Sequence, residues 1–191
     1  MAIKITNKMI LLGGQPGSGK STLGKEIAKN YKIPFFDKDL ICDKFTNFIT
    51  SEMSYKYDRN TSFYNNNIRN LEYDTVFQLG YEHANLGISS ICISPFTNEF
   101  KSNEILDELN SKLQEYNVHF ELIYIMVNAS PQNIKKRLIE RKRNEDKDKL
   151  NNWDTYIESK LSAHIASNVK IFINDDVNIT LNDIIQYLDT V

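Results

Sequence analysis

The sequence has little cysteine, proline or glycine and no long apolar run. Two cysteines, Cys42 and Cys92, are too few for a disulfide framework or a structural zinc site, so we expect a cytoplasmic protein. Four prolines and seven glycines in 191 residues exclude a collagen-like or low-complexity chain. The first apolar run, residues 9–12, is shorter than a membrane span or a signal-peptide core, so we expect no membrane association.

Charge of one sign is not in excess either. The chain has 23 Lys and Arg against 25 Asp and Glu, a formal net charge of −2, which gives no global attraction to nucleic acid. Hydrophobic residues make up 41% and aromatic residues 11% of the chain, enough for one sizeable core. We therefore expect a single domain over residues 1–191.

Short apolar runs alternate with stretches of helical periodicity. The runs cover residues 9–12, 34–36, 88–93, 122–127 and 169–173, and the helical stretches cover 20–30, 68–86, 104–116, 131–141, 153–166 and 180–188. The runs are uniformly apolar, which is typical of strands buried on both faces of a parallel sheet. This order predicts a three-layer α/β sandwich around a parallel sheet of about five strands, with ligands at the carboxyl ends of the strands.

One segment matches a phosphate-binding motif in full. The pattern G-x-x-x-x-G-K-[ST] is formed by Gly14, Gln15, Pro16, Gly17, Ser18, Gly19, Lys20 and Ser21. A predicted strand precedes it and a predicted helix follows it. Backbone N–H groups of such a loop bind phosphate at a helix N-terminus, while Lys20 can reach the β- and γ-phosphates and the Ser21 hydroxyl can ligate Mg²⁺. We therefore expect this loop, together with Thr22, to bind ATP and Mg²⁺.

Two carboxylates follow the second predicted strand, at the edge of the sheet where ligands bind. Asp37 and Asp39 are two residues apart, and in an extended chain they would project to the same side. Phosphoryl transfer to an alcohol needs a carboxylate that orients the hydroxyl and accepts its proton, and it needs a metal. We predict that Asp39 is the base and that Asp37 lies on or near the metal-bound water. The alternative is that Asp39 only caps the following helix.

This order of motifs resembles the small P-loop kinases that phosphorylate hydroxyl groups. They include shikimate and gluconate kinases, chloramphenicol phosphotransferase, zeta toxins and the kinase domain of polynucleotide kinase, and the sequence looks most like AAA-type ATP-binding kinase-like proteins. The resemblance extends from about residue 9 to residue 177. It implies a P-loop NTPase fold with a helical lid, transfer of the γ-phosphoryl group of ATP to a small-molecule hydroxyl, and Asp39 as the base.

The third predicted strand departs from the pattern of many P-loop proteins. Its end, Ile93-Ser94-Pro95, lacks the aspartate with which motors and switches orient their metal. This absence disfavours a motor or switch and leaves Ser94 and Asp37 to contact the metal-bound water. The sequence contains no N-K-x-D pattern, so we do not expect specificity for guanine nucleotides.

The helix predicted from Pro131 carries a run of basic residues and leads into a polar stretch. A polar linker between two helices is what a closing lid requires, so we expect a lid at about residues 137–152. By the resemblance, Arg137 would stack on adenine and Arg141 or Arg143 would contact phosphate. Asn174, after the last strand, would lie near the adenine. We expect Arg141 to stabilise the charge that develops during transfer.

The segment of about residues 40–86 is expected to form the acceptor site. It is rich in aromatic residues, and Lys44, Lys56, Arg59 and Arg69 are candidate anchors for a hydroxyl-bearing small molecule. A polynucleotide 5′-hydroxyl kinase is an alternative, disfavoured because acidic residues dilute the basic cluster of the lid. A nucleotide-hydrolysing switch or ATPase without an acceptor is another, which has no use for Asp39. The sequence is compatible with a monomer or a homodimer.

Overall fold

Five strands form one parallel sheet in a computed structural model that describes residues 5–52, 59, 61–143, 146–161 and 164–191. Their order across the sheet is β2-β3-β1-β4-β5. The strands are β1 (Lys8–Gly13), β2 (Phe35–Asp37), β3 (Ser90–Ile93), β4 (Glu121–Asn128) and β5 (Lys170–Ile173). The predicted parallel sheet is confirmed, with each apolar run matching one strand.

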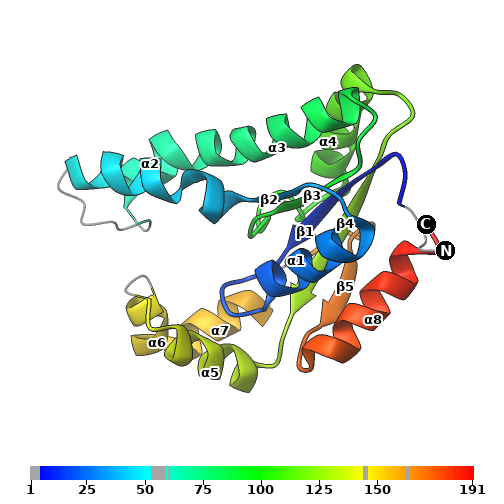
Figure 1. Ribbon diagram of the computed structural model, residues 1–191. Helices are drawn as coiled ribbons and strands as arrows, with labels where there is room; N and C mark the ends of the chain where they lie inside the picture. The colour runs from blue at the N-terminus through cyan, green and yellow to red at the C-terminus, as the bar shows by residue number, and fades with distance from the viewer. Residues whose placement is uncertain (1–4, 53–58, 60, 144–145, 162–163) are drawn as a thin grey trace.

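Helices cover both faces of this sheet (Figure 1). They are α1 (Lys20–Tyr31), α2 (Lys38–Glu52), the π-helical turn η1 (Tyr64–Ile68), α3 (Arg69–Asn85), α4 (Asn103–Tyr116), α5 (Pro131–Arg141), α6 (Lys147–Asn151), α7 (Trp153–Leu161) and α8 (Val177–Leu188). Residues of α1 and α8 pack on one face, and residues of α3 and α4 pack on the other. The three-layer sandwich is therefore confirmed.

Successive residues of β1 enter opposite core layers. Met9 and Leu11 belong to the layer shared with α3 and α4, whereas Ile10 and Leu12 belong to the layer shared with α1 and α8. All four side chains are fully buried. Because helices cover both faces, the strand has no solvent-facing side, and its sequence is a continuous apolar run rather than an alternation.

Two helix boundaries differ from the sequence-based prediction by three residues or more. The helix expected over residues 153–166 ends at Leu161, so that prediction was too long. The last helix begins at Val177 rather than at Thr180, because the Asp176 side chain accepts hydrogen bonds from the N–H groups of Asn178 and Ile179 and caps it.

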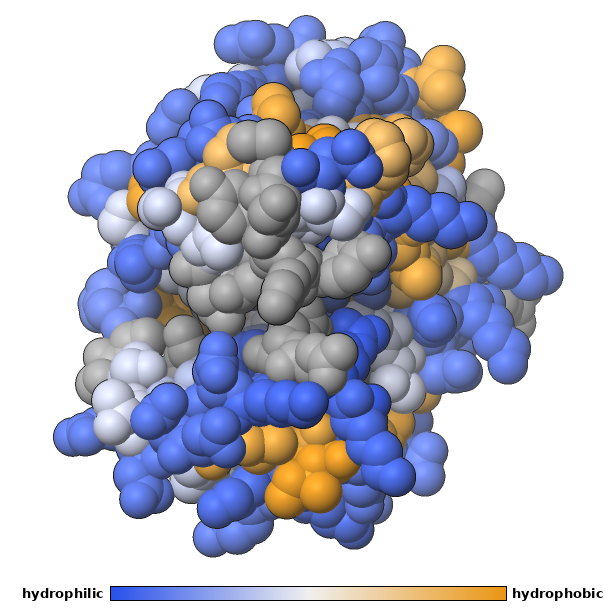
Figure 2. Space-filling model, turned by 90° about the vertical axis from the view of Figure 1, so that its left-hand side faces the viewer, coloured by the Kyte–Doolittle hydropathy of each residue, from blue (hydrophilic) through white to orange (hydrophobic). Residues whose placement is uncertain are grey.

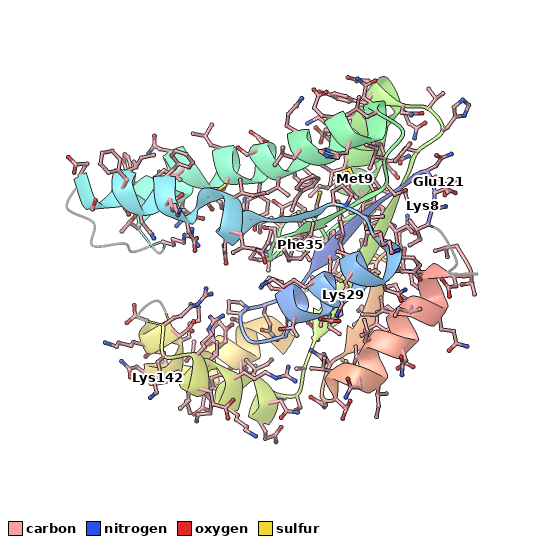
Figure 3. The ribbon with its side chains drawn as sticks, viewed as in Figure 1. Lys8, Met9, Lys29, Phe35, Glu121 and Lys142 are labelled. Atoms are coloured by element: carbon pink, nitrogen blue, oxygen red, sulfur yellow. The ribbon has the colours of Figure 1, made fainter. Side chains whose placement is uncertain are left out.

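Different structures lie at the amino and the carboxyl ends of the strands, and Figure 3 labels Lys8 and Glu121 at the amino ends. At the amino ends of β1 and β4, Lys8 and Glu121 form an ion pair of 2.5 Å. Beyond the carboxyl ends, the α2–α3 pair and the α5–α7 helices extend to the same side of the sheet, on either side of the N-terminus of α1 (Figure 1). Among the described residues, no helix has the length and apolar character that crossing a bilayer requires.

Gly24 sets the distance between α1 and the sheet. A Cβ at this position would lie 2.0 Å from Cδ1 of the fully buried Ile93. We expect Gly24→Ala to lower the free energy of unfolding by about 1–3 kcal/mol, because the added methyl overpacks this layer. Denaturant unfolding measures it, and Lys25→Ala, on the exposed side of the same helix, should stay within about 0.5 kcal/mol. Equal stability of the Gly24 variant would contradict the packing described here.

Candidate active site

The phosphate-binding loop joins β1 to α1, the strand-to-helix junction that the motif requires. Gly19 adopts the left-handed conformation, with φ 90°, and a Cβ there would lie 2.2 Å from the amide nitrogen of Asn174. Gly14 leaves no room either, since a Cβ would meet the carbonyl oxygen of Val127 at 2.5 Å. The loop therefore needs glycine at both positions. The first N–H groups of α1 to bond back to the helix N-cap are those of Thr22 and Leu23, which donate to the Gly19 carbonyl at 3.1 and 3.0 Å. The N–H groups of Lys20 and Ser21, which precede them, are thus in the position where a helix N-terminus binds an anion.

Two side chains hold the outer side of this loop. Arg137 donates to the carbonyl oxygens of Gly17 and Ser18, at 3.2 Å each, and to that of Asn174 at 2.8 Å. The Asn174 side chain, which is fully buried, donates to the Ser18 carbonyl at 2.8 Å. Both residues thus contact the loop backbone, and adenine stacking by Arg137 and proximity of Asn174 to the base remain predictions.

One cavity, of about 460 Å³, lies along the loop and α5. Its lining residues are Gly17, Gly19, Lys20, Ser21, Thr22, Arg137, Glu140, Arg141 and Arg143. They include most of the residues predicted to bind nucleotide. The cavity combines the N-terminus of α1 with four cationic side chains, an arrangement suited to a polyphosphate.

A second cavity, of about 370 Å³, lies between α2 and α3 on one side and α5, α6 and α7 on the other. It is lined by Pro16, Lys20, Lys38, Asp39, Arg59, Tyr64, Asn65, Arg69, Tyr73, Pro95, Thr97, Arg141, Lys149 and Tyr156. Lys20 and Arg141 line both cavities, so the two spaces meet at these cations. Burial lowers the pKa of Lys20, although Asp39 and Asp37 act in the opposite direction. Its ammonium group is therefore incompletely compensated and favours an anion beside it.

Asp37 and Asp39 are not related as neighbours in an extended strand. The strand β2 ends at Asp37, and Asp39 lies in the first turn of α2. The buried Asp37 carboxylate accepts the Asp39 N–H at 3.0 Å, so the helix is capped by Asp37 and not by Asp39. The expected common side was wrong, because the chain turns into a helix directly after Asp37. Asp39 nonetheless lines the second cavity with Lys20.

Two cations contact the same oxygen of Asp39. Lys38 Nζ and Arg59 Nη1 each lie 3.1 Å from Oδ1, and Oδ2 has no hydrogen bond within the described residues. Burial acts to raise the pKa of Asp39, but the charges of Lys38, Arg59 and Lys20 outweigh it and lower this pKa to about 2. Because the ordinary value is 3.8, this carboxylate stabilises the fold above about pH 4, and that contribution is lost as the pH falls toward 2.

The lid region contains a buried carboxylate that the sequence did not indicate. Asp146 is fully buried, and Arg141 binds it with both Nε and Nη2 while Lys149 contacts it at 3.2 Å. Burial opposes ionisation, but the bonds to Arg141 and Lys149 lower the pKa of Asp146. Within the predicted polar linker, Asp146 is therefore interior and α6 follows it, while residues 144–145 lie outside the described residues and the lid remains a prediction.

The candidate acceptor segment divides into several environments. Arg59 and Arg69 line the second cavity, whereas Lys44 is exposed and Lys56 lies outside the described residues. The Arg69 guanidinium stacks on the Tyr73 ring, 4.1 Å from its centre, and binds Glu99 at 3.1 Å. Of the aromatic residues, Tyr64 and Tyr73 line the cavity, Phe77 and Tyr81 belong to the core, and Phe45 and Phe48 are exposed.

Oxygen ligands for a magnesium ion are few, as expected when phosphates and waters supply most of its coordination. No cluster of three or more His, Cys, Asp or Glu side chains suited to a metal occurs among the described residues. Ser21 lines the cavity along the phosphate-binding loop. Asp37, at the end of β2, acts to raise the pKa of Lys20 in that loop. This donor set, a hydroxyl and a carboxylate, fits Mg²⁺ bound mainly through nucleotide phosphates.

Fold and loop together define a P-loop protein with the architecture of small kinases. The model of a family described as AAA domain matches residues 10–160, and the chain belongs to this family. No curated protein matches the sequence.

Several solved structures share the fold. A gluconokinase from Sinorhizobium meliloti has a TM-score of 0.59 at 13% identity, with 98% of this chain and 94% of that chain covered. A shikimate kinase from Bacteroides thetaiotaomicron has a TM-score of 0.55 at 19% identity, with 97% and 98% covered. A sugar kinase from a Janibacter species has a TM-score of 0.59 at 16% identity, with 97% and 95% covered. At these identities the likeness establishes the shared fold.

Removing the Asn174 amide should destabilise the loop. Asn174→Ala leaves the buried Ser18 carbonyl with one donor fewer, so we expect the free energy of unfolding to fall by about 1–3 kcal/mol. Asn174→Asp should cost more at neutral pH than at pH 4, because a carboxylate repels the carbonyl oxygen until it is protonated. Thermal unfolding of both variants without nucleotide measures this difference. Identical stability of the two variants at neutral pH would contradict the donor role of Asn174.

Proposed function

We propose that this protein is an ATP-dependent kinase that transfers the γ-phosphoryl group to a hydroxyl of a small anionic molecule. The observation that carries the proposal is the meeting of two cavities at Lys20 and Arg141, with Asp39 on the far side of that junction. A γ-phosphate beside these two cations would have the loop behind it and Asp39 ahead of it. Phosphoryl transfer depends mainly on such positioning and charge stabilisation.

On the nucleotide side, the loop amides and Lys20 would bind the phosphates. Ser21, and Asp37 through a water molecule, would hold Mg²⁺, which when bound neutralises phosphate charge and fixes phosphate geometry. Arg141 enters the site with its guanidinium held by Asp146. Arg141 lines both cavities, and its positive charge there would stabilise the charge that develops on the transferred phosphoryl group in the transition state.

On the acceptor side, Asp39 would accept a hydrogen bond from the hydroxyl. Its lowered pKa keeps it ionised and makes it a weak base before transfer. In a loose transition state the hydroxyl becomes strongly acidic only as the bond to phosphorus forms, so a weak, well-oriented base is sufficient. We assign Asp39 to orientation first and to proton acceptance late.

The second cavity favours a small acceptor that carries negative charge. Its lining includes six cationic side chains and one carboxylate, and its volume is about 370 Å³. Arg59 and Arg69 lie on the acceptor side, each held by carboxylates behind it. The similar structures include kinases named for gluconate, shikimate and sugar, all small and hydroxylated. An arginine fork recognises carboxylate or phosphate groups.

Two substitutions separate nucleotide binding from transfer. We expect Lys20→Ala to weaken ATP binding roughly 10- to 100-fold, because a charge-assisted contact to phosphate is lost. Asp39→Asn should leave ATP binding within about two-fold and lower kcat of transfer by about 10²–10⁴-fold. Calorimetric titration with a non-hydrolysable ATP analogue and a labelled-phosphate assay measure the two effects. Undiminished transfer by the Asp39 variant would refute its assigned role.

Acceptors tested in matched pairs identify the substrate class. We expect a hydroxy acid or a sugar phosphate to accept labelled phosphate, and its neutral amide or dephosphorylated counterpart to react at least about 10-fold less well. Short oligonucleotides in the same panel test the polynucleotide alternative. Preference for the neutral members would overturn the anionic class, and ATP hydrolysis unaffected by every compound would favour an ATPase without an acceptor.

A further inference from the structure

The acceptor side of the molecule is organised around one buried carboxylate, that of Glu72 on α3. Its side chain is only 3% exposed and accepts four hydrogen bonds. Lys38 Nζ and the Tyr64 hydroxyl donate to Oε2, the latter at 2.6 Å, and the Thr46 hydroxyl and Arg59 Nη2 donate to Oε1 at 2.5 and 3.2 Å. The donors come from α2, from η1 and from the chain between them. Burial raises the pKa of Glu72, but these donors outweigh it and keep the carboxylate ionised.

Glu72 and Asp39 share the same two cations. Lys38 Nζ contacts Glu72 and also lies 3.1 Å from Asp39 Oδ1, while Arg59 bonds Glu72 through Nη2 and Asp39 through Nη1. Arg59 Nη2 is also 2.6 Å from Asp43. Both cations therefore approach Asp39 from the side of Glu72 and bind one oxygen, so that the other carboxylate oxygen has no bond within the described part of the chain.

The network also faces the cavity rather than lying behind it. Lys38, Arg59 and Tyr64, three of the four donors to Glu72, line the space that contains Asp39. The fourth, Thr46, is buried and does not line that space. A hydrogen-bond network that only stabilised the packing of the helices would not need its cations to line the cavity.

We propose that Glu72 is a positioning residue, which holds Lys38 and Arg59 so that they fix one oxygen of Asp39 and leave the other for the acceptor hydroxyl. This inference rests on the proposed kinase function. It assigns to α3 a part in the reaction that the phosphate-binding motif and the Asp37–Asp39 pair do not reveal. Without the charge of Glu72, the ion-pair partners left among the described residues are Asp39 for Lys38, and Asp39 and Asp43 for Arg59. We expect the two cations then to engage both oxygens of Asp39.

Glu72→Gln tests the effect on catalysis, with Thr46→Val as the matched control. The glutamine keeps the shape of the side chain and removes its charge, whereas valine removes one donor to Glu72 and keeps that charge. We expect Glu72→Gln to lower kcat of transfer at least about 10-fold per nucleotide-binding site, with the KM for ATP and the hydrolysis of ATP without acceptor within about two-fold. Thr46→Val should lower the thermal unfolding temperature and leave transfer within about two-fold.

A purely structural role would give a different result. Loss of folded protein lowers transfer and acceptor-free hydrolysis together, so an unchanged ratio of the two in Glu72→Gln would overturn the proposal. An equal loss of transfer in Thr46→Val would also overturn it. If Glu72→Gln does not fold, Lys38→Met/Glu72→Gln removes both charges of the buried pair, which proteins often tolerate. Wild-type transfer by that double variant would equally overturn the inference.

A crystal structure of Glu72→Gln tests the geometry without any acceptor. We expect Lys38 and Arg59 to turn until both oxygens of Asp39 are engaged, and retention of the one-oxygen contact would overturn the positioning role. This measurement separates the two ideas, since absence of transfer from the wild-type protein to every acceptor would refute the kinase function while the rearrangement at Asp39 could still be observed.

Discussion

The part of the molecule around α2 and α3, which we propose as the acceptor side, depends on charge shared between two carboxylates and two cations. Lys38 and Arg59 each contact both Asp39 and Glu72, and the charge of Lys38 lowers the pKa of both carboxylates. Such a cluster adds little net stability compared with an apolar core of the same volume, because removing ions from water is costly. It does fix the geometry of the site, because each of the two cations contacts both carboxylates and cannot move without losing a contact. The same segment leaves Phe45 and Phe48 exposed, so apolar burial contributes less here than in the sheet.

The nucleotide half depends on a different constraint, the direction of the loop peptides. Arg137 and Asn174 bind the carbonyl oxygen of Ser18 from outside the loop. In a trans peptide the carbonyl and the following N–H point in opposite directions, so this contact turns the Gly19 N–H away from Arg137 and toward the inner side of the loop. Holding the Ser18 carbonyl outward therefore directs the Gly19 N–H group inward, where it can donate a hydrogen bond. The loop is organised for an anion by bonds that an anion does not touch.

Sequence patterns predicted the elements whose chemistry is local. The five apolar runs gave the strands, because burial on both faces leaves an uninterrupted signal. The loop was predictable because glycine, lysine and serine occur at the spacing that phosphate binding needs. Asp39 was chosen for its position after a strand, although the geometry assumed for it was wrong, since the chain enters a helix one residue earlier.

Glu72 and Asp146 were not predicted, for a physical reason. Glu72 is bound by Lys38, which lies 34 residues away. Asp146 is bound by Arg141 and Lys149, five and three residues away, but it lies in a wholly polar run in which nothing marks one acid as buried. On its own helix Glu72 follows an exposed Leu71 and precedes a buried Tyr73, a pattern that does not distinguish it from a surface residue. The only local signal is Lys38 itself, a lysine between two aspartates at the end of a buried strand. A buried cation at that position implies that a further negative charge lies nearby, but it does not indicate which residue supplies that charge.

The two halves meet through cations that each belong to a carboxylate network. Arg141 is held by Asp146 from the lid, and Lys38 is held by Glu72 from α3, while Lys20 between them has no carboxylate of its own at ion-pair distance within the described residues. Lys20 is thus the position where an added anion gains most, because its charge is desolvated and uncompensated. A phosphate bound there would in turn attract Arg141 from one side while Asp39, fixed by Lys38 and Arg59, stays in place on the other. In the proposed reaction, this arrangement would place the nucleotide phosphates at Lys20 and leave the second oxygen of Asp39 for the acceptor hydroxyl.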